Sequence, residues 1–439
     1  MIDSHELRRR DSYLNKLIGF QDTEPVKVIT GIRRCGKSSL LKLMVQHLKD
    51  TGVLPEQIIE MNFESFDFHK MSADDVYRYV KERIIAGKRM YLFFDELQRI
   101  KAWEDAVNAF RVDFDCDIYV TGSNAYLLSS EYATYLSGRC VEIKMLPLSF
   151  REFLDFHGFD VRETQSALGG LRKQVFDKNN ERYELREVFA AYMRFGGMPG
   201  IADVGLEQEK VLALLDGIYS TVVIRDILER ETRRGQKQIT DPALLRKIIL
   251  FLADNIGSSV SIASIGNILV NEGLLDDDKR KGIPRAHTVQ AYVNALLESY
   301  FFYEIKRFDI KGKAYLRTLG KYYIVDIGLR NYLLGFRNRD SGHAIENVVY
   351  FELLRRGYDV AIGKIGNGEV DFIATTADEK KYIQVTESMM SEDVRKRELA
   401  PLQSIRDNYE KIVLSLEPGL DTSYDGIKSE NLIDWLLNE

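Results

Sequence analysis

The order of hydrophobic and polar residues predicts alternating strands and helices in the first third of the chain. Short apolar runs at residues 26–30, 90–94 and 116–121 have the length and continuity of buried strands. Between them lie longer stretches, such as 37–48, in which apolar residues recur at helical spacing. A parallel sheet with helices on its faces produces this alternation. We therefore expect an α/β core at residues 1–150.

The rest of the chain predicts three further regions. Residues 151–235 show helical periodicity broken by glycines at 169–170 and 196–200, and we interpret them as a helical lid or linker. Residues 236–335 predict three helices followed by a β-hairpin, the pattern of a winged helix-turn-helix. Residues 336–439 predict a helix followed by strands.

The turn between the first strand and the first long helix fits the phosphate-binding pattern G-x-x-x-x-G-K-[ST] at every position. Glycines allow backbone N–H groups to approach a polyphosphate, and the N-terminus of the following helix favours its negative charge. In such a loop Lys37 reaches the outer phosphates and Ser38 holds Mg²⁺. A chance match in a strand-to-helix turn is the alternative. The predicted nucleotide-binding residues are Gly31, Ile32, Arg33, Arg34, Cys35, Gly36, Lys37, Ser38 and Ser39.

Two acids end the next strongly apolar strand. Ligands of open α/β sheets bind at the carboxyl ends of the strands, so Asp95 and Glu96 are expected beside the phosphate-binding loop. We predict that Asp95 binds the Mg²⁺ shell and that Glu96 polarises the attacking water, which implies hydrolysis as well as binding.

Three more polar residues are weaker candidates for catalysis. Ser123 and Asn124 follow the strand at 116–121 and can sense the outermost phosphate, although an ordinary turn has the same composition. Arg139 precedes another strand and is either an arginine finger that reaches a neighbouring subunit or a surface arginine. A finger would imply a homo-oligomer.

Composition narrows the function classes. The chain has 439 residues, a formal net charge of −6 and a pI of about 5.8, so any binding of nucleic acid requires a local basic patch. The arginines at 8–10 either approach a nucleotide or are solvated, and solvation is the default for a charge run. Three cysteines without C-x-x-C spacing indicate neither a disulfide framework nor a zinc site. Neither a signal segment nor an apolar run long enough to span a bilayer is recognisable, and we expect a cytoplasmic protein.

These motifs together resemble a large prokaryotic family of AAA+-type ATPases. The resemblance covers essentially the whole chain and rests on the phosphate-binding loop, on the strand ending in Asp95 and Glu96, and on the stretches at 121–123, 147–153, 196–199, 224–227, 322–329 and 346–347. It implies binding of ATP with Mg²⁺, hydrolysis of ATP, and a C-terminus made of a winged helix and a restriction-endonuclease-like α/β domain. It brings no established physiological role.

The endonuclease-like region departs from the pattern of active nucleases. Active members carry an Asp followed, on the next strand, by Glu-x-Lys, which together hold a metal and a water. Asp371 occupies the first position, but Gln384 and Thr386 replace the Glu and the Lys. Glu387 is expected on the opposite face of the strand because side chains alternate. We therefore expect the nuclease fold without nuclease activity.

The sequence favours an ATPase that couples ATP binding and hydrolysis to a C-terminal module, with DNA as the leading ligand of that module. Seven basic residues would form the DNA-binding face: Arg285, His287, Lys306, Arg307, Lys311, Lys313 and Arg317. The main alternative is a slow nucleotide-dependent switch or assembly protein that binds other proteins. An ATP-dependent nuclease is disfavoured by Gln384 and Thr386.

Overall fold

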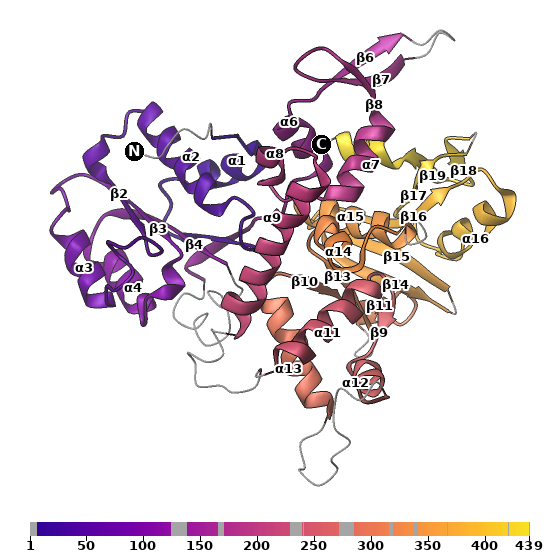
Figure 1. Cartoon of the computed structure of the whole chain (residues 1–439). Helices are drawn as coiled ribbons and strands as arrows, with labels where there is room; N and C mark the ends of the chain where they lie inside the picture. The colour runs from indigo at the N-terminus through magenta and orange to yellow at the C-terminus, as the bar shows by residue number, and fades with distance from the viewer. Residues whose placement is uncertain are drawn as a thin grey trace. The chain divides into compact units, whose positions relative to one another are not determined.

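The computed structural model describes residues 7–123, 138–165, 171–228, 239, 241–271, 285–315, 319–337, 341–366, 368–419 and 421–438 (Figure 1). The chain divides into two compact units. The first contains Met1–Leu146 together with Glu298–Tyr300, and the second contains Pro147–Leu297 and Phe301–Glu439.

The first unit is built on a parallel sheet of five strands, which confirms the predicted α/β core. The strand order is β2-β3-β4-β1-β5. Its strands are β1 (Val26–Thr30), β2 (Ile58–Asn62), β3 (Met90–Asp95), β4 (Cys116–Gly122) and β5 (Cys140–Lys144). Its helices are α1 (Asp11–Gly19), α2 (Lys37–Asp50), α3 (Ala73–Lys81) and α4 (Trp103–Asp113).

Helices α3 and α4 cover one face of this sheet. Val76 and Val80 of α3 and Phe110 of α4 pack in one cluster with Leu92 and Phe94 of β3, and all of them are almost fully buried. Strands that are buried on both faces read as continuous apolar runs, which is why β1 and β3 were recognisable in the sequence.

Strand β1 nevertheless contains a fully buried lysine. The Lys27 Nζ donates hydrogen bonds to Asp117 of β4 and to the Thr23 carbonyl, at 2.8 Å for the latter. Asp117 also accepts from the Tyr119 hydroxyl at 2.9 Å. Burial lowers the pKa of Lys27, and the hydrogen bond to Asp117 opposes this shift. A buried ion pair of this kind is costly to break on one side.

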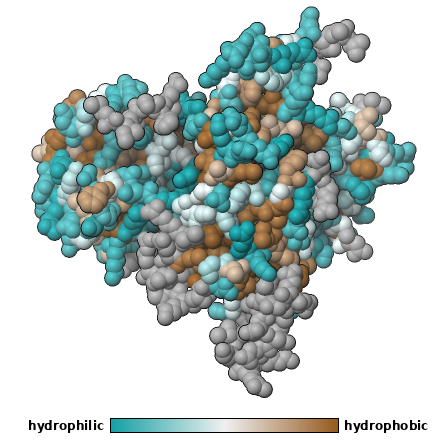
Figure 2. Space-filling model, viewed as in Figure 1, coloured by the Kyte–Doolittle hydropathy of each residue, from teal (hydrophilic) through white to brown (hydrophobic). Residues whose placement is uncertain are grey.

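The region at 151–235 is not wholly helical. Helices α6 (Phe150–His157), α7 (Leu185–Phe195), α8 (Ile201–Val204) and α9 (Gln208–Ser220) agree with the prediction, and a π-helix covers Thr221–Leu228. Residues 160–184 instead form an antiparallel sheet of β6 (Asp160–Gln165), β7 (Leu171–Phe176) and β8 (Arg182–Glu184). The outward surface of this sheet is hydrophilic (Figure 2), so its strands lack the apolar alternation that identifies a strand.

The three predicted helices of the next region are present. They are α11 (Pro242–Asp254), α12 (Ile262–Asn271) and α13 (Arg285–Glu298). A small antiparallel sheet accompanies them, with β13 (Gly320–Ile324) paired to β10 (Phe302–Ile305) and to β9 (Ser259–Val260). Strands β11 (Arg307–Asp309) and β12 (Ala314–Tyr315), which lie between β10 and β13 in sequence, pair instead with the C-terminal sheet.

That C-terminal sheet has eight strands in the order β12-β11-β14-β15-β16-β17-β19-β18. Its strands from residue 359 onward are β14 (Asp359–Ile365), β15 (Gly368–Thr375), β16 (Lys380–Ser388), β17 (Glu410–Glu417), β18 (Ser423–Tyr424) and β19 (Ile427–Asn431). The helices of this half are α14 (Ile327–Leu334), α15 (Ser341–Arg355), α16 (Glu392–Gln403) and α17 (Leu432–Leu437). β14, β15 and β16 pair antiparallel, whereas β16 and β17 pair parallel across the α16 crossover.

Among the helices of the described residues, none has both the length and the apolar character needed to cross a membrane.

Candidate functional site at the carboxyl edge of the first sheet

The strand order brings the predicted site residues to one edge of the sheet. β4 lies between β1 and β3, and all three strands run parallel. The phosphate-binding loop follows β1, Asp95 and Glu96 end β3, and Ser123 follows β4. Loop, acids and Ser123 therefore meet at the carboxyl ends of three adjacent strands, which is where ligands of parallel sheets bind.

The glycines of the loop are required by its backbone. Gly31 has φ = 143°, and a Cβ placed there would lie 2.1 Å from the Met145 carbonyl oxygen. Gly36 has φ = 103° and precedes the first residue of α2. The side chains of Ile32 and Cys35 are fully buried, so these two residues can offer a phosphate only their backbone.

The remaining side chains of the loop are polar and differ in accessibility. Lys37 is buried, and its Nζ donates to the carbonyls of Gly31 and Ile32 at 2.9 and 3.0 Å. Ser38 and Ser39 are exposed in the first turn of α2, which contains no acidic residue. The dipole of α2 and the Lys37 ammonium therefore both favour an anion at the N-terminus of α2, and no carboxylate on that turn opposes them. Of the two loop arginines, Arg34 is exposed, whereas the side chain of Arg33 is only 12% exposed and pairs with Glu64 at 2.5 Å.

The two acids of β3 are held in different ways. Asp95 is buried and accepts from the Thr121 hydroxyl at 2.5 Å and from the Asn62 amide at 3.2 Å. Glu96 adopts a left-handed backbone (φ = 58°), and its N–H donates to Thr121 Oγ1 at 3.0 Å. Thr121 therefore links the Asp95 carboxylate to the backbone of Glu96.

Ser123 supports the Glu96 carboxylate. Its hydroxyl donates to Glu96 Oε2 at 3.2 Å, and the Gln98 amide donates to the same oxygen at 2.6 Å. Two donors on one oxygen orient the carboxylate, which a general base requires. Asn124, the other polar candidate at this strand end, lies outside the described residues.

Arg139 lies at the other edge of the sheet. Its carbonyl accepts from the N–H of Val26, the first residue of β1, at 2.9 Å, whereas the phosphate-binding loop follows the last residue of β1. The side chain is exposed. Arg139 therefore cannot reach the loop of its own chain, and a catalytic role is open to it only on another subunit.

Sequence reasoning missed several residues that shape this edge. Arg10, taken to be solvated, is buried, and its guanidinium donates to the carbonyls of Cys35 and Leu146 at 3.0 and 2.9 Å while lying over the Tyr13 ring. The burial of Arg10 could not be predicted from the charge run, because its partners are backbone carbonyls far away in the sequence. Asn62 ends β2 as Asp95 ends β3, and this shared position was the signal that could have found it.

These residues fit a nucleotide with Mg²⁺. The loop can supply backbone N–H groups and the Lys37 ammonium to phosphates, and Ser38 with Asp95 are oxygen ligands of the kind that Mg²⁺ prefers.

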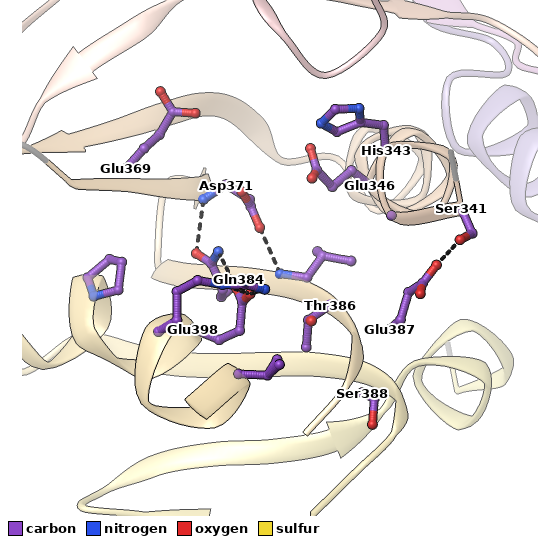
Figure 3. Close-up of a pocket in the computed structure, with 15 residues that line it drawn as sticks. Ser341, His343, Glu346, Glu369, Asp371, Gln384, Thr386, Glu387, Ser388 and Glu398 are labelled. Carbon is purple, nitrogen blue, oxygen red and sulfur yellow. Dashed lines mark hydrogen bonds and ion pairs between the residues drawn. The ribbon is translucent and has the colours of Figure 1, made fainter. Parts of the chain in front are cut away.

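A second cluster of polar residues lines a cavity of about 810 Å³ in the second unit (Figure 3). Asp371 of β15 and Gln384 of β16 point toward one another there, with Asp371 N donating to Gln384 Oε1 at 3.4 Å and Val385 N donating to Asp371 Oδ2 at 2.9 Å. Thr386 lines the same cavity. Glu387 does too, contrary to the expectation that it faces away, because it lies near the end of β16, where Ser341 of α15 donates to its carboxylate.

Two charged residues, one that lines this cavity and one that pairs with its carboxylates, were not predicted. Glu398 of α16 is buried and accepts from the Gln384 amide at 3.0 Å. Lys321 of β13 is buried beside Glu369 and Glu346, at 2.8 and 3.8 Å. Burial raises the pKa of Asp371 well above its ordinary value and that of Glu346 to about 6. Neither Glu398 nor Lys321 stands at a motif position, so only the folded chain brings them to Asp371.

The sequence profile of an AAA domain matches residues 23–154, and that of a domain of unknown function (DUF8612) matches residues 186–340. Two uncharacterized proteins are similar over nearly the whole chain. One, from Haemophilus influenzae, is 38% identical over 98% of either chain. The other, MJ1544 of Methanocaldococcus jannaschii, is 30% identical over 95% of this chain and 85% of its own.

Solved structures show more distant similarity. A Walker-type ATPase of Pyrococcus abyssi aligns with 74% of this chain and 95% of its own, with 17% identity and a TM-score of 0.48. AMPPCP-bound DnaA from Aquifex aeolicus aligns with 64% of this chain and 91% of its own, with 14% identity and a TM-score of 0.26.

The parallel sheet, the phosphate-binding loop and the AAA-domain match define a P-loop protein of the AAA+ ATPase type. The chain belongs to the same family as these two relatives. In this chain the AAA domain is followed by a region that matches a domain of unknown function.

Proposed function

We propose that this protein hydrolyses ATP with Mg²⁺ and uses the cycle to rearrange a C-terminal module that binds DNA or a partner. The observation that carries the hydrolysis is Glu96, a carboxylate oriented by Ser123 and Gln98 next to the phosphate-binding loop. In the proposed reaction Lys37 binds the outer phosphates, Ser38 and Asp95 hold the metal, and Glu96 takes a proton from the attacking water.

For the C-terminal module we propose a winged helix followed by a nuclease-like domain without nuclease activity. Helices α11, α12 and α13 with the β9–β10–β13 sheet support the winged helix. The order α15-β14-β15-β16-α16-β17, with its antiparallel and parallel pairs, supports the nuclease-like fold. Thr386 in place of a lysine supports the lack of cleavage.

DNA is the leading ligand because Lys306, which precedes β11, and Lys311 and Lys313, in the β11–β12 turn, are all exposed. Arg307 is removed from the predicted basic face, since it is half-buried and pairs with Glu369 at 3.5 Å. Arg317 and the Arg285 side chain lie outside the described residues.

The second candidate is a switch that binds proteins, and one observation favours it. The outer surface of α13 offers the amides of Gln290 and Asn294, bonded to one another at 2.8 Å, and the helix carries no lysine or arginine after Arg285. A recognition helix for DNA usually also presents lysine or arginine there, and the bond between the two amides leaves fewer of their groups to contact a base edge.

The rate of ATP hydrolysis, measured with and without DNA across salt concentrations, tests both proposals. DNA binding predicts a stimulation that falls steeply with salt, because bound cations are released from the phosphates. A triple change of Lys306, Lys311 and Lys313 to glutamine should abolish the stimulation, and Lys49→Gln, at an exposed position of α2, is the control. Hydrolysis that ignores DNA at every salt concentration supports the protein-binding switch.

A further inference from the structure

A short segment from the C-terminal half of the chain, Glu298–Tyr300, belongs to the first compact unit. The residues before it, up to Leu297, and after it, from Phe301 onward, belong to the second unit. Helix α13 of the proposed winged helix ends at Glu298. The segment therefore continues this helix directly while its own contacts lie in the unit that carries the phosphate-binding loop.

Tyr300 is the residue of this segment that reaches the strands of the first unit. It is only 5% exposed. Its hydroxyl donates to Glu142 Oε1 of β5 at 3.3 Å, and the Thr30 hydroxyl of β1 donates to the same oxygen at 2.5 Å. The Lys144 Nζ lies 6.0 Å from the centre of the Tyr300 ring. Burial, together with the Glu142 charge, raises the pKa of Tyr300, so its hydroxyl keeps the proton that it donates.

Thr30 immediately precedes the phosphate-binding loop, and the packing around it leaves little room for movement. Its carbonyl accepts from the Met145 N–H at 2.7 Å. At the next residue, Gly31, even a Cβ would lie 2.1 Å from the Met145 carbonyl oxygen. Close-packed contacts of this kind pass a displacement on to their neighbours. A nucleotide that shifts the loop therefore also shifts the Thr30 hydroxyl relative to the oxygen that it shares with Tyr300.

The backbone of Tyr300 is held in a rare conformation. Its φ of 57° lies in the left-handed region, which bulky side chains seldom adopt. The next residue is fixed within the second unit, because the Phe301 N–H donates to the Leu296 carbonyl at 3.2 Å and the Val325 N–H donates to the Phe301 carbonyl at 3.0 Å. A strained residue persists only where its surroundings hold it, so a change at its side chain gives the backbone a second conformation to adopt.

We propose that Tyr300 is a positioning residue that transmits the nucleotide state of the phosphate-binding loop to α13, through the bonds that Thr30 and Tyr300 both make to Glu142. The inference rests on the proposed binding of ATP at the loop, and it assigns a residue to the coupling between ATP and the C-terminal module. Such coupling is reciprocal, so a ligand that binds at α13 changes the affinity for ATP by the same factor as ATP changes the affinity for that ligand.

Hydrogen–deuterium exchange of the full chain, with and without saturating Mg-AMPPNP, tests the inference. In the wild type the nucleotide should change the exchange rates of α13 amides by at least about fivefold. Tyr300→Phe removes only the hydroxyl, so this change should be lost while the affinity for AMPPNP stays within about threefold. Tyr322→Phe is the matched control. The Tyr322 hydroxyl is also buried and also donates to a glutamate, Glu304, at 3.3 Å, so this variant loses an equal bond and should keep the change.

A second pair of variants keeps the test decisive if Tyr300→Phe fails to fold. Glu142 is exposed on the edge strand β5. Glu142→Ala removes the shared acceptor and should lose the change in α13, whereas Glu142→Gln keeps an acceptor oxygen and should preserve most of it. Binding of AMPPNP to the wild type without any change in α13, or a change of full size in both Tyr300→Phe and Glu142→Ala, would overturn the inference. Failure of the wild type to bind AMPPNP would overturn the proposed nucleotide site itself, and the inference with it.

Discussion

Replacement of Glu96 by glutamine separates nucleotide binding from hydrolysis. The amide oxygen of glutamine can still accept the hydrogen bonds that Ser123 and Gln98 donate to Glu96 Oε2 at 3.2 and 2.6 Å. Glutamine has nearly the same volume and the same backbone preference as glutamate, so the left-handed conformation at φ = 58° is no more strained. The free energy of unfolding should therefore change by less than about 0.5 kcal/mol.

The rate should change far more than the stability. An amide cannot take a proton from water, and loss of a general base lowers rates by about 10²- to 10⁴-fold. At ~1.36 kcal/mol for each factor of ten, this corresponds to about 2.7–5.4 kcal/mol of activation free energy. Asp95 keeps its bonds to Thr121 and Asn62, so affinity for Mg-ATP should stay within about threefold of wild type, less than the ~1 kcal/mol of one lost hydrogen bond.

Two measurements check this prediction, single-turnover hydrolysis and equilibrium binding of a fluorescent ATP analogue with Mg²⁺. Gln98→Ala is the matched control, because it removes one donor to Glu96 and keeps the base. Its loss of rate should be smaller than that of Glu96→Gln. Wild-type hydrolysis by Glu96→Gln, or loss of its nucleotide binding, would show that Glu96 is not the base.

Four further outcomes are expected. Lys37→Ala removes the ammonium beside the loop, so ATP binding should weaken and hydrolysis should be lost while the circular dichroism spectrum is kept; wild-type turnover would contradict the site. Specific activity should rise with protein concentration and become concentration-independent and low in Arg139→Ala, and a demonstrated monomer with full activity would exclude action in trans. Lys27→Met strips the buried Asp117 of its partner and should cost about 3–5 kcal/mol in chemical denaturation, against little change for exposed Lys49→Met. The wild-type protein should not cut linear, circular or single-stranded DNA with Mg²⁺ or Mn²⁺, and cutting that disappears in Asp371→Ala would refute this.

The sequence predicted which residues meet at the carboxyl edge of the first sheet, because the signals for them are local. The backbone of the phosphate-binding loop requires glycine at positions 31 and 36. The acids that follow an apolar run mark where that strand ends. Parallel strands then bring separate ends together without any long-range knowledge. The roles of these residues and of Arg139 in catalysis remain predictions.

What sequence reasoning missed depends on partners that are distant in the chain. Arg10 bonds to backbone carbonyls at Cys35 and Leu146, and a carbonyl has no signature in sequence. The strands at 160–184 carry polar residues on exposed faces, so neither a helical nor a strand period stands out. Glu398 and Lys321 reach Asp371 from a helix and from another sheet, which a search along β15 and β16 alone cannot find.

The placement of β11 and β12 has a consequence for how this chain can be divided. Both strands lie between β10 and β13 in the sequence, yet β11 pairs with β14 of the C-terminal sheet. A protein shortened after residue 335 would keep a hairpin with no sheet to join, and a fragment beginning at 336 would expose the edge of β14 to association with other chains. The domain boundary predicted from the sequence, between residues 335 and 336, is therefore a poor place to truncate the protein. The regions 236–335 and 336–439 share a β-sheet and are therefore expected to fold together.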